Sequence, residues 1–174
     1  MFRGFRLASP WIVVLSLSAV FFSMRLMSYA DASDEAQIRA LEQRFTAAFK
    51  AKDVDKIMTN YEHSQKLVVF DVVPPRQYVG WDAYKKDWQD FLATFDGPIT
   101  VEMKDLTVSA DGNLGYGYSF QHVAGKAKAG GPLDFTVRVT DVYRKTGGKW
   151  LIVHEHVSVP VDMASGKADL QSKP

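Results

Sequence analysis

The chain has 174 residues, of which 47% are hydrophobic and 24% charged, and these values predict one compact domain rather than two. Its formal net charge is +1 and its basic residues are scattered, so no stripe of Lys and Arg is available to displace the counterions of a nucleic acid. The absence of cysteine excludes disulfides, thiolate nucleophiles and thiolate metal ligands.

The first 32 residues have the pattern of a secretion signal. Arg3 and Arg6 give a positive start, the apolar run 11–24 follows, and small residues offer cleavage sites after Ala30 or Ala32. The run is shorter than the ~20 residues that span a bilayer. We therefore predict a cleaved signal peptide and a periplasmic or secreted protein without a membrane span after cleavage. An uncleaved membrane anchor is the alternative.

The mature domain is expected to begin with helices. Residues 33–53 repeat apolar side chains at three- and four-residue spacing, which indicates an amphipathic helix. Asp53 is expected to cap a second, short helix over residues 54–61. A third helix is predicted over residues 81–95, where the apolar face is unusually aromatic.

The rest of the domain is predicted to form β-strands. A β-branched run at 66–73 predicts one strand, which Pro74 closes. Four long strands, separated by glycine-containing turns, are then predicted at residues 99–109, 114–125, 133–145 and 149–159. Helices that precede a mostly antiparallel sheet define an α+β domain. We assign residues 33–160 to this domain and expect a flexible tail at 161–174.

Two segments carry a resemblance to a known family. They are FDVVPPRQYVGWDAY at 70–84 and RVTDVYRKTGGKWLIVHEHVSVP at 138–160. Together with the order of the elements, they resemble the SnoaL-like branch of the nuclear transport factor 2-like and ketosteroid isomerase-like superfamily. The resemblance implies a cystatin-like cone, in which a curved, mostly antiparallel sheet wraps around three N-terminal helices, a ligand pocket inside it and frequent dimerisation. The superfamily contains isomerases, hydrolases, cyclases and binding modules, so the fold alone does not give the function.

The resemblance to ketosteroid isomerase suggests catalytic carboxyl groups. That enzyme uses an Asp general base and an oxyanion hole made of a Tyr and a protonated Asp. Asp71 matches the base and Asp141 lies close to the protonated acid, whereas the position of the tyrosine holds Phe45, which cannot donate a hydrogen bond. The alternative is that Asp71 caps a strand end and that Asp141 pairs with an arginine such as Arg138.

The last strand leaves open which of its faces lines the pocket. Strict alternation puts His154 and His156 on one face and Glu155 on the other. In the related association domain of calcium/calmodulin-dependent kinase II, a pocket arginine matches Asp141, which favours the Glu155 face. The opposite face would combine Arg138 with both histidines, a set suited to a carbonyl or carboxylate, or to hydrogen bonds in a dimer interface.

Three functions follow from these patterns. The first is an exported domain that binds a small, largely apolar molecule in the conical pocket; the residues expected to contact it are Tyr61, Tyr84, Trp88, Tyr118, Arg138 and Glu155. The second is a cofactor-independent isomerase, cyclase or hydratase, with Asp71 as general base and Asp141 and His156 as further catalytic residues. The third is a dimerisation module, and a homodimer is expected.

No cofactor or metal is expected from the sequence. It contains no nucleotide-binding glycine loop and no nucleophile elbow. His154 and His156 are placed to share a metal, but no spacing points to a third ligand.

Overall fold

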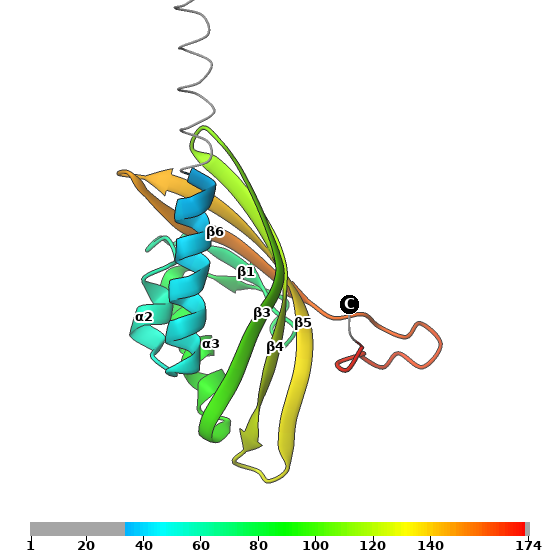
Figure 1. Ribbon diagram of the computed structural model, residues 1–174. Coiled ribbons are helices and arrows are strands. Elements are labelled where there is room, and N and C mark those ends of the chain that lie inside the picture. Colours follow the sequence, from blue (N-terminus) through cyan, green and yellow to red (C-terminus); the bar gives the residue numbers. More distant parts are fainter. Residues whose placement is uncertain (1–33, 173–174) are drawn as a thin grey trace, which may run out of the picture.

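The computed structural model describes residues 34–172, so the predicted signal peptide lies outside the described residues (Figure 1). The first helix covers residues 34–50. The elements that follow it are α2 (Val54–Met58), β1 (Val68–Phe70), β2 (Tyr78–Val79), α3 (Trp81–Leu92), β3 (Phe95–Asp111), β4 (Leu114–Ala127), β5 (Pro132–Thr146) and β6 (Lys149–Ser158).

Side-chain contacts fix the starts of the first two helices. Asp53 caps α2, as predicted, because its side chain accepts a hydrogen bond of 3.0 Å from the backbone N–H of Lys56. Asp34 lies in the first turn of the first helix, forms an ion pair with Lys145 of β5 and accepts a 3.1 Å hydrogen bond from Nε1 of Trp150 on β6. The beginning of this helix is therefore attached to the sheet.

The strands form one six-stranded sheet in the order β2-β1-β6-β5-β4-β3. β1 and β6 are parallel and the other neighbours are antiparallel. The sheet is curved, and the helices lie on its concave side (Figure 1). The predicted α+β architecture is confirmed, although the short strand β2 was not predicted.

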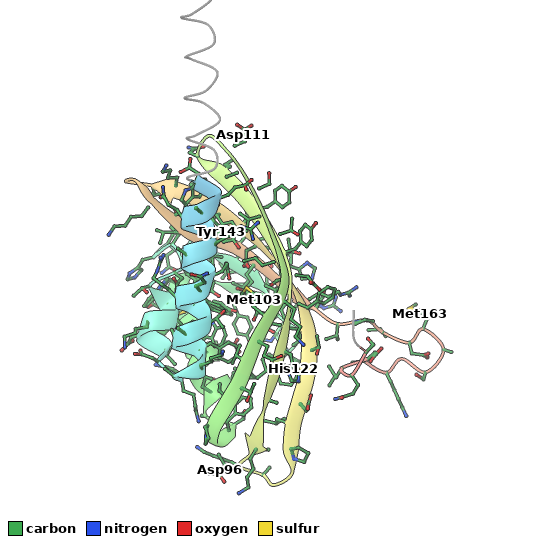
Figure 2. The ribbon with its side chains drawn as sticks, in the orientation of Figure 1. Asp96, Met103, Asp111, His122, Tyr143 and Met163 are labelled. Atoms are coloured by element: carbon green, nitrogen blue, oxygen red, sulfur yellow. The ribbon has the colours of Figure 1, made fainter. Side chains whose placement is uncertain are left out.

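The core lies between the helices and the concave face of the sheet. Tyr84, Tyr143 and Phe95 are among its largest fully buried side chains. Figure 2 shows Tyr143 beside the first helix, facing it from the sheet. Gly117 of β4 allows this position, because a Cβ atom there would lie 2.8 Å from the Tyr143 hydroxyl.

The C-terminal segment leaves β6 on the side of the sheet opposite the helices (Figure 1). Val161 pairs with Ala168, and the carbonyl of Leu170 accepts a 3.0 Å hydrogen bond from the backbone N–H of Thr136. The segment thereby continues the edge of β5 that β6 leaves unpaired. The flexibility expected for residues 161–174 stays a prediction.

Within residues 34–172, none of the helices has the length and apolar character needed to span a bilayer.

Candidate functional site: buried carboxyl groups inside the cone

A bulge in β6 decides which of its side chains face the helices. Ile152 and Glu155 are both buried, although strict alternation places them on opposite faces. The pairing of β5 with β6 shifts between Val142 and Tyr143, which leaves Val153 as an extra residue on β6. The prediction of uninterrupted alternation along this strand is therefore wrong at Val153. Beyond the bulge, the Glu155 face is the inner one.

Three carboxyl groups are buried inside the cone, and we call them the core carboxyl cluster: Glu42 of the first helix, Asp141 of β5 and Glu155 of β6. Their exposed fractions are 1%, 4% and 3%. Among the described residues, none of the three has a Lys, Arg or His partner at ion-pair distance. That part of the chain also contains no group of His, Asp and Glu side chains arranged to hold a metal ion.

Glu155 is the most heavily hydrogen-bonded member of the cluster. The Tyr61 hydroxyl donates to its Oε2 at 2.7 Å, and the Tyr84 hydroxyl donates to its Oε1. Asp141 also shares a hydrogen bond with Glu155, which requires a proton on one of the two carboxyl groups. Burial, and then the charge of Glu155, raise the pKa of Asp141 well above its usual value, so Asp141 is the donor.

The two tyrosines reach Glu155 from different elements. The segment after α2 runs parallel to β6, with Ile152 donating to the carbonyl of Asn60 and accepting from the N–H of Glu62, both at 2.8 Å. This pairing places Tyr61 beside the strand, while Tyr84 comes from α3. Two tyrosines thus provide donors inside a cone whose first helix carries Phe45.

The other end of the cluster is the pair formed by Glu42 and Tyr143. The Tyr143 hydroxyl donates to Oε1 of Glu42 at 2.7 Å. Burial raises the pKa of Glu42 to about 7, against the effect of this hydrogen bond and with a smaller contribution from the charge of Glu155. Burial raises the pKa of Glu155 as well, despite its three donors. The core carboxyl cluster therefore retains protons near neutral pH.

A second carboxyl pair, which we call the rim pair, consists of Asp71 and Asp87. Asp71 directly follows β1 and Asp87 lies on α3; both are half-buried, and their carboxyl groups are within hydrogen-bonding reach of each other. Burial raises the pKa of Asp71 to about 7, and the charges of Glu155 and Asp87 add to the shift. Burial also raises the pKa of Asp87. Asp71 can therefore donate or accept a proton near neutral pH.

Aromatic rings pack in the space beside these carboxyl groups. Tyr61 contacts Tyr84 at a centroid distance of 5.3 Å and Phe45 at 6.3 Å, each edge to face. Trp88 packs against Phe49 at 4.9 Å, and its buried Nε1 has no hydrogen-bond partner within residues 34–172. The predicted ligand-contacting residues Tyr61, Tyr84 and Trp88 therefore pack against other aromatic rings.

Three other predicted site residues lie on the outer face of the sheet: Tyr118, Arg138 and His156. Thr140 of β5 pairs with Tyr118 on one side and His156 on the other, and its side chain is exposed. Tyr118 is 50% exposed. The structure thus groups Asp141, Glu155, Tyr61 and Tyr84 inside the cone, with Asp71 half-buried beside them, and separates the three outer residues from this group. The alternative pairing of Asp141 with Arg138 is not found, because they occupy opposite faces.

Sequence reasoning missed Glu42, Tyr143 and Asp87. Glu42 follows Leu41 in the buried stripe of the first helix, so a charged residue within an apolar stripe was the available signal. Asp87 lies one turn after Tyr84 on α3, but nothing in its local sequence indicates that the loop after β1 reaches it.

The fold agrees with what comparison with known proteins shows. The profile of the SnoaL-like domain matches residues 38–162. The chain therefore belongs to the SnoaL-like domain family. No match is found among curated proteins.

A solved structure places the chain among nuclear transport factor 2-like proteins, and more distant structures share the fold. A nuclear transport factor 2-like protein of unknown function from Pseudomonas putida is 30% identical, with a TM-score of 0.74, over 82% of this chain and 98% of its own. A nuclear transport factor 2 superfamily protein from Salmonella enterica is 17% identical, with a TM-score of 0.69, over 79% and 99%. A ketosteroid isomerase-like protein from Erwinia carotovora is 19% identical, with a TM-score of 0.61, over 72% and 95%.

Proposed function

We propose that the chain binds a small, largely apolar molecule next to the rim pair. The observation that carries this proposal is the half-buried Asp71, whose pKa of about 7 lets it donate or accept a hydrogen bond at neutral pH. The partly buried ring of Tyr78 is the apolar group at this place, and it packs against the fully buried Tyr84 at a centroid distance of 5.9 Å. Convergent polar groups beside aromatic rings are typical of sites for small molecules.

The charge of this region favours a neutral or cationic ligand over an anion. Asp71, Asp87 and Glu155 are carboxyl groups, so each is either negatively charged or neutral in this region. Among the described residues, no Lys or Arg forms an ion pair with any of them. An anionic ligand would have to enter against these carboxyl groups. A ligand with a carbonyl or hydroxyl group on an apolar body suits the site best.

A thermal-shift screen across neutral and charged metabolites tests binding at this site. A true ligand raises Tm by an amount that grows with the logarithm of its concentration once that concentration exceeds Kd, and this shift is expected to fall for Asp71→Asn. Asp82→Asn, at an exposed position of α3 that contributes to neither rim-pair pKa, is the matched control and should keep the shift. A ligand whose shift is the same in all three proteins binds elsewhere and contradicts the proposal.

The second candidate function is acid–base catalysis on an enolisable ketone. It is supported by the pKa of about 7 for Asp71, because a base is most effective when its pKa lies near the operating pH. Asp71 would take a proton from the carbon next to the carbonyl and return it to a neighbouring carbon. The rate should rise with a midpoint near pH 7 and be lost in Asp71→Asn. Equal rates in both proteins exclude Asp71 as the base.

We also propose a homodimer that forms through the outer face of the sheet. Leu114, Tyr116 and Tyr118 are each about half exposed there, at 49%, 51% and 50%. Sedimentation of the wild type and of Tyr118→Lys tests this surface. A monomeric wild type, or a dimer that the lysine does not weaken, contradicts it.

Export stays a proposal supported by the pattern of the first 32 residues. Intact-mass measurement of the protein recovered outside the cytoplasm should give a chain that starts at Asp31 or Ser33. A cytoplasmic chain of full mass contradicts export.

A further inference from the structure

A groove of about 430 Å³ lies on the surface away from the carboxyl groups described above. One wall is the first helix, which contributes Gln37, Ala40 and Arg44, and the other is the start of β6 with Lys149 and Trp150. The three helix residues share one face because they are spaced at three and four positions. Ala40 leaves room between its longer neighbours.

The groove carries two cations that the described residues do not neutralise. Arg44 and Lys149 come from opposite walls and both are exposed. Neither forms an ion pair with a described carboxylate, and the lining contains no Asp or Glu. Other cations of the same hairpin are paired: Lys145 with Asp34 and Arg144 with Glu62. The positive charge of the groove is thus local and uncompensated.

The base of the groove is held in place. Trp150 is only 4% exposed, and its indole N–H donates to Asp34, so the ring cannot turn without losing this hydrogen bond. Lys149 follows the Gly147–Gly148 turn, in which both glycines have positive φ angles of 58° and 79°. A two-residue turn of this kind fixes where β6 begins, and with it the backbone position of Lys149.

We propose that this groove binds a dianionic phosphate group. The planar guanidinium of Arg44 presents paired donors that match two phosphate oxygens, and the Lys149 ammonium acts as a point charge from the opposite wall. A bound dianion relieves the repulsion between the two cations. The site is separate from the rim pair, where the charge has the opposite sign, so the two sites select different ligands.

Titration of the full mature chain with inorganic phosphate, followed by NMR at constant ionic strength set with sodium chloride, tests this proposal. We expect saturable shifts confined to residues 37–44 and 148–151. The double variant Arg44→Gln/Lys149→Gln should weaken binding by about tenfold or more. Lys104→Gln/Lys126→Gln removes the same net charge from β3 and β4 and is expected to keep the wild-type affinity.

A third variant separates shape from charge. Ala40→Leu fills the groove, keeps both cations and replaces alanine with another good helix former, so it should also lose phosphate binding. Equal weakening in both double variants would show that phosphate responds to net charge alone and would overturn the proposal. Non-saturable shifts, or full binding by Ala40→Leu, would overturn it as well.

Discussion

The hydroxyl of Tyr61 donates a 2.7 Å hydrogen bond to Oε2 of Glu155, and it does so in a region where both side chains are almost completely buried. This contact joins the segment after α2 to β6 through side chains as well as through the backbone. A buried carboxyl group that relies on neutral donors is sensitive to the loss of any one of them.

Removal of the Tyr61 hydroxyl should therefore destabilise the fold. We expect Tyr61→Phe to lower the free energy of unfolding by about 1–3 kcal/mol, because Glu155 would lose a donor that water cannot replace. Tyr118→Phe is the control, since Tyr118 is half exposed on the outer face. Urea denaturation at neutral pH measures both. Equal losses in the two variants would contradict a special role for the buried hydroxyl.

Stability should fall as the pH rises, because of Glu42. Its pKa is raised from 4.5 to about 7 in the folded chain, so the folded state holds a proton that the unfolded chain releases. The stabilisation that depends on this proton is complete below about pH 4.5 and is lost as the pH rises through about 7, with a magnitude on the order of 3 kcal/mol.

Two variants check this assignment in opposite directions. Glu42→Gln cannot ionise and should flatten the fall in the free energy of unfolding between pH 4.5 and 7. Tyr143→Phe removes the hydrogen bond that lowers the pKa of Glu42, so this pKa should rise further and the fall in stability should become larger and extend to higher pH. An unchanged pH profile in Glu42→Gln would assign the fall to Asp141, Glu155 or Asp71 instead.

The pKa of Asp71 should depend on its partner in the rim pair. Asp87→Asn removes a like charge and supplies an amide donor, so it should lower the pKa of Asp71 below about 7. Asp82→Asn changes an exposed carboxylate of the same helix that contributes to neither pKa, so it should leave the midpoint in place. Carboxyl carbon NMR titration reads the midpoint directly. The same midpoint in all three proteins would mean that the pair does not share a proton.

Gly117 and Tyr143 should be energetically coupled. A Cβ atom at Gly117 would lie 2.8 Å from the Tyr143 hydroxyl and 3.2 Å from the carbonyl of Thr107. Gly117→Ala is expected to cost about 1–3 kcal/mol of stability through overpacking. The cost should be smaller in a Tyr143→Phe background, where the hydroxyl is absent. A double-mutant cycle with no coupling would contradict the contact.

The sequence was sufficient to predict the helices and strands that follow a regular spacing of apolar residues. The apolar spacing of the first helix and of α3 appears in the structure, and on β5 the alternation that buries Asp141 and Tyr143 is uninterrupted. The capping role of Asp53 could be predicted because a helix cap contacts residues that are close to it in the chain. These features share one cause, which is that the interacting residues lie within a few positions of one another.

The site required information that local patterns do not carry. The extra residue at Val153 leaves no mark in the sequence, because a bulge is defined by the pairing with β5. The meeting of Asp71 with Asp87, and of Glu42 with Tyr143, depends on how distant elements pack. Asp71, Asp141 and Glu155 were found because the family resemblance supplied this long-range information.

The core carboxyl cluster couples the folding of the chain to the uptake of protons. Since Glu42 and Asp141 hold protons in the folded chain near neutral pH and the unfolded chain releases them, folding at that pH consumes protons from solution. The protons act as ligands of the native state, and their concentration is set by the pH of the buffer. In a weakly buffered solution, the chain should make its surroundings more alkaline as it folds.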